Sequence, residues 1–349
     1  MACGSRGFSP ATSRLAVLSS TNIPSMKATV VREFGEPEVL TLADVPDPQP
    51  GPNQILVRVH AAGVNPFDTY MRTGTYATRP ALPYIPGADA AGVVETVGSE
   101  VSGVTAGARV YISGTATHKS YGAYAQKVVC EPHQVHPLPD RLSFAQGAGI
   151  GVPYVTAFRA LHDRARIQPG ETLFIHGASG GVGLAATQVA RAWGLTIIGT
   201  AGTSEGLDLI CAQGAEHALN HRESGYLDAL KDLTGGRGPD VILEHLANVN
   251  LDNDLSAICY GGRIVVVGNR GRIEIDPRKT MGKDSTILGV SLWNTPAADL
   301  RRIYRALDAG LAVGSLSPVV ATELPLREAA RAHEMVLAPG AKGKIVLVP

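Results

Sequence analysis

A glycine-rich turn between a predicted strand and a predicted helix most constrains how this chain can fold. An apolar run over residues 172–176 leads into His176-Gly177-Ala178-Ser179-Gly180-Gly181-Val182-Gly183, and apolar residues then recur at helical spacing over residues 181–193. Glycines let a backbone turn tightly and approach a phosphate, and the free N–H groups at a helix start donate to it. Such a turn predicts a site for the diphosphate of a nucleotide, although the glycine spacing departs from G-x-G-x-x-G.

Strands and helices continue to alternate after this turn. Strands are predicted at residues 196–200, 217–220, 241–244, 263–267 and 287–292, and helices at residues 205–212, 225–234 and 251–258. Strands that alternate with helices form a parallel sheet covered on both faces. Residues 149–312 are therefore predicted to form a doubly wound α/β domain that binds the nucleotide.

The region before this domain has a different pattern, with short β-runs broken by glycine and proline. The predicted strands are residues 28–31, 55–61, 91–97, 109–113 and 123–129. A length of 349 residues suits two domains. We expect a mostly β domain over residues 26–148, closed by residues 313–349, whose last β-run at residues 345–348 returns to the first domain.

The charge balance and the cysteines exclude several classes of protein. The 31 basic and 31 acidic residues cancel, so no net field favours nucleic acid, an anionic membrane or a strongly acidic partner. Cys3, Cys130, Cys211 and Cys259 form no C-x-x-C pair, which argues against a structural zinc lobe and a disulfide framework. No apolar stretch approaches the ~20 residues of a membrane span.

Residues 1–25 differ in composition from the rest of the chain. They contain Arg6, Arg14 and several serines but no acidic residue, which is typical of a mitochondrial transit peptide. Pro10 and Pro24 oppose a helix there, which favours a disordered tail instead. We therefore expect a cytoplasmic protein, or a mitochondrial one if this leader is cleaved.

The end of the second strand of the α/β domain bears on the choice between NAD and NADP. A carboxylate at this point would hold the ribose 2′-hydroxyl of NAD, but the sequence reads Gly199-Thr200-Ala201-Gly202-Thr203-Ser204. The nearest basic residues follow in Asn220-His221-Arg222, while Glu205 argues mildly for NAD. We predict NADPH as the cofactor.

Several motifs together resemble the medium-chain dehydrogenase/reductase superfamily, and within it the zeta-crystallin branch of NADPH:quinone oxidoreductases. The resemblance covers nearly all of the chain after residue 25. It implies a β-rich GroES-like domain beside a Rossmann domain. The motifs are Ala62-Gly63-Val64-Asn65-Pro66-Phe67-Asp68-Thr69-Tyr70, Gly74-Thr75-Tyr76, Pro86-Gly87-Ala88-Asp89, the glycine turn with Gln188 and Arg191, Leu246-Ala247-Asn248-Val249-Asn250 and Val267-Gly268-Asn269-Arg270-Gly271.

The resemblance also implies roles for particular residues. The zinc alcohol dehydrogenases of the superfamily have a cysteine ligand where this chain has Asn65 and a histidine ligand where it has Ala88, so we expect a reaction without a metal ion. Asn65 and Tyr70 are expected to orient acceptor and nicotinamide, and Tyr76 to line the pocket. Cofactor contacts are implied at Tyr70, Ser179, Gly180, Gly181, Val182, Gly202, His221, Asn250, Val267, Gly268, Asn269, Arg270, Val290, Ser291 and Leu292.

Three functions follow from the resemblance. The first is zinc-independent, NADPH-dependent reduction of ortho-quinones, with single-electron transfer to a semiquinone as an inherited feature. The second is reduction of 2-alkenals or enoyl thioesters, because related mitochondrial reductases have a catalytic tyrosine in a loop similar to Gly74-Thr75-Tyr76. The third is a lens crystallin or a binder of AU-rich single-stranded RNA, for which the neutral, aromatic-poor composition gives little sign. A homodimer or homotetramer is expected through edge pairing near residues 287–292.

Overall fold

The computed structural model describes residues 24–114 and 122–349. The predicted leader therefore lies outside the described residues, apart from its last two positions. Ser25 already belongs to the first strand, β1 (Ser25–Val31).

The second half of the described chain forms a parallel sheet of six strands in the order β10-β9-β8-β11-β12-β13. The order reverses beside β8, so that β9 and β11 lie on its two sides, and ligands bind at such a switch point in doubly wound sheets. The predicted α/β fold is confirmed. The strands are β8 (Thr172–Ile175), β9 (Thr196–Ala201), β10 (His217–Asn220), β11 (Val241–Glu244), β12 (Arg263–Val266) and β13 (Thr286–Gly289).

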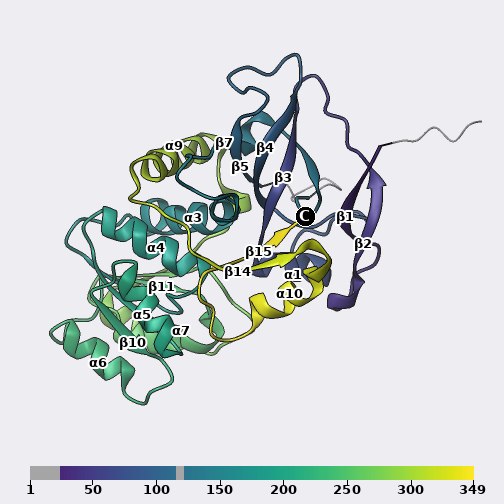
Figure 1. The fold of residues 1–349 in the computed structure, drawn as a ribbon. Helices are drawn as coiled ribbons and strands as arrows, with labels where there is room; N and C mark the ends of the chain where they lie inside the picture. The colour runs from purple at the N-terminus through teal and green to yellow at the C-terminus, as the bar shows by residue number, and fades with distance from the viewer. Residues whose placement is uncertain (1–23, 115–121) are drawn as a thin grey trace, which may run out of the picture.

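Helices connect these strands and cover both faces of the sheet (Figure 1). α4 begins directly at the predicted glycine turn, and α5 is capped by the Thr203 hydroxyl, which accepts a hydrogen bond from the Gly206 N–H. The helices are α3 (Gly151–Phe158), α4 (Gly181–Ala192), α5 (Ser204–Ala212), α6 (Tyr226–Leu233), α7 (Ala247–Ala257), α8 (Pro277–Lys283) and α9 (Ala297–Val313).

Two predicted element bounds in this domain are wrong. The last strand ends at Gly289, so Val290, Ser291 and Leu292 follow the strand and Leu292 begins a 3-10 turn. Helix α7 begins at Ala247 rather than at residue 251. Its first turn contains the polar residues Asn248 and Asn250, so apolar periodicity does not reveal this part of the helix. Apolar periodicity marks the buried face of an element, and it therefore misses the ends that face solvent or a cleft.

The β-rich lobe contains residues from both ends of the described chain. Its larger sheet has the order β14-β15-β3-β4-β5-β7, with β6 also paired to β3, and β1 pairs with β2 in a separate ribbon. Figure 1 shows β15, near the C-terminus in yellow, beside β3 in purple. The other strands are β2 (Leu40–Pro46), β3 (Ile55–Val64), β4 (Asp89–Val97), β5 (Arg109–Ser113), β6 (Lys127–Cys130), β7 (Val135–Pro137), β14 (Val320–Pro325) and β15 (Lys344–Val348).

This lobe also holds short helices that the β-runs did not predict. α1 (Pro66–Arg72) follows β3, α2 (Phe144–Gly147) follows β7, and α10 (Ala329–Leu337) separates β14 from β15. Asn65 precedes α1 at its N-cap, where the Asp68 side chain accepts from the Asn65 N–H over 2.9 Å. The strand predicted at residues 123–129 begins only at Lys127, because residues 123–126 divide their backbone hydrogen bonds between residues 86–87 and residues 27–29 instead of pairing with one strand.

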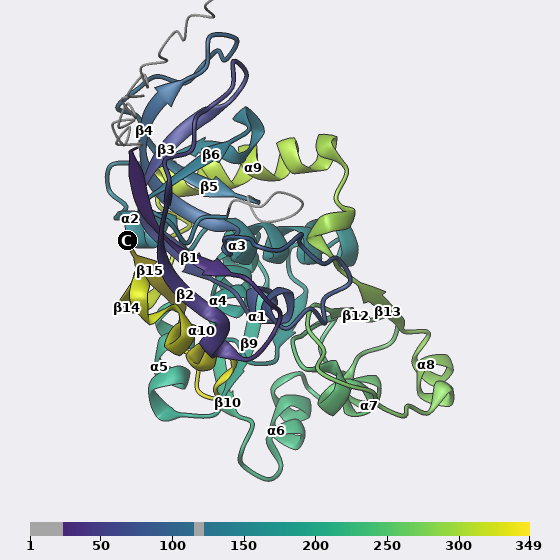
Figure 2. The same ribbon diagram turned by 90° about the vertical axis from the view of Figure 1, so that its right-hand side faces the viewer.

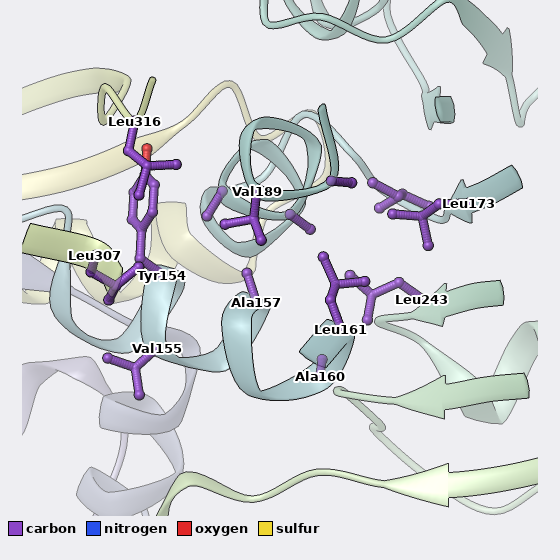
Figure 3. Packing of buried hydrophobic residues seen from close by; sticks show 14 of the residues in the cluster. Tyr154, Val155, Ala157, Ala160, Leu161, Leu173, Val189, Leu243, Leu307 and Leu316 are labelled. Carbon is purple, nitrogen blue, oxygen red and sulfur yellow. The ribbon is translucent and has the colours of Figure 1, made fainter. Parts of the chain in front are cut away.

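A hydrophobic core joins the two lobes. Figure 3 shows Tyr154 of α3 beside Leu307 and Leu316, and Leu161 of the π-helical extension (Arg159–Ala165) near the sheet residue Leu243; Val189 of α4 belongs to the same cluster. Leu307 of α9 and Leu316 close the same cluster, and each of these side chains is buried. Packed apolar contacts of this kind hold the six-stranded parallel sheet, called the cofactor sheet below, at a defined position against the β-rich lobe. No helix within residues 24–114 and 122–349 is long and apolar enough to cross a membrane.

Candidate active site

A cleft of about 1390 Å³ lies between the two lobes. Its walls come from the end of β3 and α1 on one side, and from the glycine turn and the segments after β11, β12 and β13 on the other. The segment before β15 closes one end. The cleft therefore opens at the carboxyl ends of the parallel strands, where doubly wound sheets bind their ligands.

The glycine turn forms one wall of the cleft. Gly177 has a φ of +59°, a left-handed conformation that glycine adopts without steric cost. Gly183 packs so closely on Ala178 that a Cβ at position 183 would lie 2.6 Å from the Ala178 Cα. Helix α4 leaves the N–H groups of its first turn without partners inside the helix, next to the cleft-lining Gly180 and Gly181. The turn thus provides the donors that a diphosphate requires.

The side chains that line the cleft are strongly biased toward positive charge. Arg270, Arg272 and Lys342 belong to the lining, as does Lys344, whose ammonium is already paired with Asp89, whereas no Asp or Glu among the described residues lines the cleft. The full chain has no net charge, so this local bias distinguishes the cleft from the rest of the molecule. A cationic cleft with free helix N–H groups fits an anionic dinucleotide.

A neutral histidine adds a hydrogen-bond acceptor to this wall. His245 follows β11, and its Nδ1 lies 2.7 Å from the carbonyl oxygen of His176, so Nδ1 carries the proton and donates it. Burial lowers the pKa of His245, and its Nε2 has no partner among the described residues. The Nε2 atom itself is buried, so it is an unsatisfied acceptor inside this wall.

The adenosine end is marked by residues outside the cleft lining. A Cβ on Gly202 would lie 2.8 Å from the Arg222 Nε and 2.9 Å from the His221 Nε2. The structure thus brings His221 and Arg222 against the end of β9, where the NAD-type carboxylate is missing. Arg222 is exposed, and no ion pair within the described residues uses it.

Most of the predicted site residues lie together in the cleft. The lining includes Asn65, Tyr70, Tyr76, Gly180, Gly181, Val182, Val267, Gly268, Asn269, Arg270, Val290, Ser291 and Leu292. Ser179, Gly202, His221 and Asn250 lie outside it. Ser179 belongs to the turn but is buried, and the side-chain amide of Asn250 donates to the Glu244 Oε1 over 3.3 Å.

A buried cluster of His176, Glu244 and Asp254 lies at the start of the glycine turn, which begins at His176. The His176 Nε2 lies 2.8 Å from the Asp254 Oδ1 and 3.5 Å from the Glu244 Oε2. Burial raises the pKa of both carboxyl groups to about 7, and Glu244 Oε2 and Asp254 Oδ2 have no hydrogen-bond partner among the described residues. A proton shared between the two carboxyl groups satisfies both oxygens at neutral pH.

One end of the cleft is formed by Asn65 and by three aromatic side chains. We call it the acceptor end, because Asn65 is expected to orient the electron acceptor. The Asn65 Nδ2 donates to the Asp89 Oδ2 over 2.9 Å, and the Asn65 Oδ1 accepts from the Lys344 Nζ. Trp293 lies 5.5 Å from Phe67 between ring centroids and donates from its indole N–H to the Tyr76 hydroxyl. Burial raises the pKa of Tyr76, which makes this phenol a weak acid at neutral pH.

Comparison with known proteins agrees with this arrangement. Residues 51–140 match the profile of the alcohol dehydrogenase GroES-like domain, and residues 181–308 match that of zinc-binding dehydrogenases. Human quinone oxidoreductase is 49% identical over 325 residues, which cover 93% of this chain and 98% of that protein. The chain belongs to the quinone oxidoreductase family of medium-chain dehydrogenases/reductases. It is therefore an oxidoreductase.

Solved structures share the whole fold. A crystal structure of Escherichia coli quinone oxidoreductase complexed with NADPH has a TM-score of 0.82 at 31% identity, covering 93% of this chain and 99% of that one. A structure described as an NAD-dependent alcohol dehydrogenase has a TM-score of 0.86 at 31% identity, covering 93% of this chain and 100% of that one. The GroES-like and Rossmann architecture is thus common to this family and to the alcohol dehydrogenases.

Two positions at which the zinc alcohol dehydrogenases have zinc ligands hold other residues in this chain. The Asn65 amide is occupied by Asp89 and Lys344, and Ala88 is a buried residue without a ligand atom. Within residues 24–114 and 122–349, the only group of His, Cys, Asp and Glu with metal-ligand spacing is His176, Glu244 and Asp254, below the glycine turn.

Several residues of the site were not identified from the sequence. Trp293, Phe67 and His245 line the cleft without belonging to a predicted functional set, and Lys344 lies one position before the β-run predicted at residues 345–348. One signal was available for Lys344, since a charged residue opens an otherwise apolar strand. Local pattern gives no comparable signal for Trp293, which follows an edge strand.

Proposed function

We propose that this protein is an NADPH-dependent quinone reductase that acts on ortho-quinones. One observation carries the proposal: a cationic cleft at the glycine turn ends at aromatic walls formed by Phe67, Tyr76 and Trp293. The two parts suit an anionic dinucleotide and a flat aromatic acceptor, held next to each other.

Each part of NADPH has suitable residues in this chain. The first turn of α4 would bind the diphosphate, and Arg222 with His221 would bind the 2′-phosphate beside Gly202. The segments after β12 and β13, which line the cleft, would hold the nicotinamide half. When bound, NADPH supplies the electrons for the reduction. The chain's own contribution is to orient the two reactants and to exclude water.

The shape and chemistry of the acceptor end favour a quinone over an acyl thioester. Aromatic rings pack on flat conjugated rings with offset or edge geometry, and Phe67, Tyr76 and Trp293 offer faces and edges of this kind. The Tyr76 hydroxyl accepts from Trp293 and its pKa is raised, so the proton that completes the product comes from solvent.

The test compares two acceptors with two cofactors. The oxidation of NADPH and of NADH is followed at 340 nm with 9,10-phenanthrenequinone and, separately, with a trans-2-enoyl thioester. We expect turnover with NADPH and the quinone, and little with NADH or the thioester. Turnover of the thioester at a higher kcat/KM than the quinone would assign the protein to the alternative enoyl reductases.

Transfer of single electrons is a further part of this proposal. A semiquinone released from the site passes an electron to oxygen, and the resulting superoxide reduces cytochrome c. We expect quinone-dependent reduction of cytochrome c that superoxide dismutase suppresses. Stoichiometric hydroquinone without superoxide would show two-electron reduction instead.

Homo-oligomers, localisation and RNA binding complete the proposal. β13 is an edge strand with partly exposed Ile287, and Figure 2 shows it at the margin of the molecule, so a second copy can extend the sheet there. Light scattering of the protein and of Ile287→Lys would test this interface.

Localisation and RNA binding need separate experiments. The location of a fluorescently tagged full chain in cells would distinguish the cytoplasm from mitochondria. Competition between NADPH and AU-rich RNA would show whether the RNA enters the cationic cleft.

A further inference from the structure

A buried lysine lies at the floor of the cleft, at the acceptor end. Lys344 begins β15 and is 5% exposed, yet it belongs to the cleft lining. Its ammonium group donates to the Asn65 Oδ1 and lies 3.3 Å from the Asp89 Oδ2. Removing an ammonium from water is costly unless it is paired and hydrogen-bonded, so these two partners are what hold the group in place.

The surrounding backbone makes room for this ion pair. A Cβ on Gly63 would lie 2.8 Å from the Lys344 Cε, and one on Gly151 would lie 2.2 Å from the Asp89 Oδ1. That second carboxylate oxygen accepts the Val152 N–H over 2.9 Å. Glycines at both positions therefore leave space for the lysine stem and for the carboxylate.

The Asp89 carboxylate does not require the lysine to be satisfied. The Val152 N–H and the Asn65 Nδ2 already donate to its two oxygens. The ammonium uses two of its three N–H groups on Asn65 and Asp89, and no third acceptor for it lies among the described residues. A positive charge with a free donor thus lies in the wall of the cleft, shielded from water, where electrostatic interactions are strong.

We propose that the Lys344 ammonium is the fixed positive charge that stabilises the acceptor oxygen as reduction places negative charge on it. This inference rests on the proposed quinone reduction. Transfer of one electron converts an ortho-quinone into the semiquinone anion. Transfer of two electrons and one proton converts it into the catechol monoanion, which a second proton from solvent completes to the catechol. Both products of reduction carry negative charge on oxygen. The ammonium is hydrogen-bonded to Asn65, so it supplies at this position a positive charge that a metal ion would otherwise provide.

The charged groups around Lys344 support a paired ammonium. Burial lowers the pKa of Lys344, whereas the carboxylates of Asp89 and Asp68 oppose that shift. Asp68 is itself fully buried, and burial raises its pKa to about 7. The Asp89 Oδ2 lies 3.3 Å from the ammonium, so Asp89 is the ion-pair partner of Lys344.

The decisive experiment measures binding of an anion without any turnover. 4-Nitrocatechol is an analogue of the reduced ortho-quinone, and its ionisation is visible in its absorbance. We expect the native protein to bind the catecholate at least tenfold more tightly than Lys344→Met/Asp89→Asn, in which both charges are removed together. Equal catecholate affinity in these two proteins would overturn the proposal.

A matched variant separates the ammonium from its partner. Lys344→Met alone keeps Asp89, whose oxygens still accept from the Val152 N–H and the Asn65 Nδ2, and it should bind the catecholate as weakly as the double variant. Tight binding of the catecholate by Lys344→Met would assign the effect to Asp89 and would also overturn the proposal. Circular dichroism and an NADPH affinity within about threefold of the native value establish that each variant is folded.

The same samples distinguish this inference from the proposed function. Failure of the native protein to reduce any quinone with NADPH would overturn the proposed function, whereas the catecholate measurement decides the role of Lys344 independently. If both hold, the double variant should also lose most of its kcat for 9,10-phenanthrenequinone while keeping its affinity for NADPH.

Discussion

The indole N–H of Trp293 donates a 2.6 Å hydrogen bond to the phenol oxygen of Tyr76. Tyr76 lies between α1 and β4 in the β-rich lobe, and Trp293 follows β13 of the cofactor sheet. Both line the cleft, so the bond connects the two lobes at the acceptor end. Phe67 packs against both rings, with centroid distances of 6.0 Å to Tyr76 and 5.5 Å to Trp293.

Breaking this bond should weaken acceptor binding. Tyr76→Phe keeps the ring but removes the hydroxyl oxygen to which the indole N–H donates. A hydrogen bond of this kind contributes about 1 kcal/mol. We expect the KM for 9,10-phenanthrenequinone to rise about fivefold with little change in NADPH affinity. Measured in a Trp193→Phe background, where Trp293 is the remaining tryptophan, the emission maximum should also shift. An unchanged KM and emission spectrum would contradict the predicted role of the bond.

Tyr70 is expected to act through its hydroxyl at the cofactor. Tyr70 belongs to α1 and lines the same cleft as Gly180 and Gly181 of the glycine turn. Tyr70→Phe should weaken NADPH binding about threefold to tenfold, because one hydrogen bond is lost while the packing is retained. Quenching of NADPH fluorescence measures the affinity. If turnover and affinity both stay at native values, the hydroxyl has no role.

Selectivity between the two cofactors should depend on Arg222. Its guanidinium lies beside Gly202, where a 2′-phosphate would be placed, and a charge-assisted bond to phosphate is worth about 1.5–3 kcal/mol. Arg222→Met should therefore weaken NADPH binding by about tenfold or more and leave NADH binding nearly unchanged. Arg278→Met on the exposed helix α8 is the matched control for the loss of one positive charge. An equal loss for both cofactors would place the 2′-phosphate elsewhere.

The cofactor half of the site could be predicted because its signals are local. The glycine turn, the strands around it and the missing carboxylate after Thr200 all follow from short stretches of sequence, since one strand, one turn and one helix build the diphosphate site. Val267 to Arg270 could be placed for the same reason, because they follow a predicted strand at the same edge of a parallel sheet.

The acceptor half depends on long-range contacts that no local pattern contains. Asn65 and Lys344 are 279 positions apart and meet only because β15 pairs with β3. Tyr76 and Trp293 are 217 positions apart and meet only because the lobes close on each other. The same holds for His176 and Asp254, which belong to different strand–helix units. Apolar periodicity predicts which face of an element is buried, but not which polar side chain it will meet.

The shared proton of Glu244 and Asp254 predicts how stability depends on pH. Their folded-state pKa values, about 7, lie above the unfolded values, so the stability that protonation contributes is present at low pH and is lost as the pH rises through 7. Glu244→Gln replaces the unpartnered oxygen by an amide donor and removes this loss. Relative to the native protein, the variant should gain about 1–2 kcal/mol in the free energy of unfolding between pH 5 and pH 8.

Chemical denaturation at several pH values measures this difference. Glu334→Gln, at an exposed position of α10, is the matched control and should follow the native curve. A constant difference between Glu244→Gln and the native protein from pH 5 to pH 8 would show that the two carboxyl groups do not share a proton.

The glycine turn contains two helical glycines that should respond oppositely to the same substitution. A Cβ at Gly183 would lie 2.6 Å from the Ala178 backbone, which cannot move without distorting the turn, whereas a Cβ at Gly181 would lie 3.6 Å from its nearest neighbour in Pro153. Gly183→Ala should therefore cost about 1–3 kcal/mol of stability. Gly181→Ala should keep or raise the Tm, because alanine favours the helix at both positions equally.

NADPH affinity should reveal an effect of Gly181→Ala that protein stability does not. Gly181 lines the cleft, so its new methyl group occupies space beside the N–H groups that bind the diphosphate, and NADPH affinity should fall in a protein of native stability. Thermal unfolding and NADPH fluorescence on the same samples provide both values. A Gly181→Ala protein that binds NADPH normally would mean that the diphosphate does not approach the start of α4, and the placement of the cofactor at this turn would be wrong.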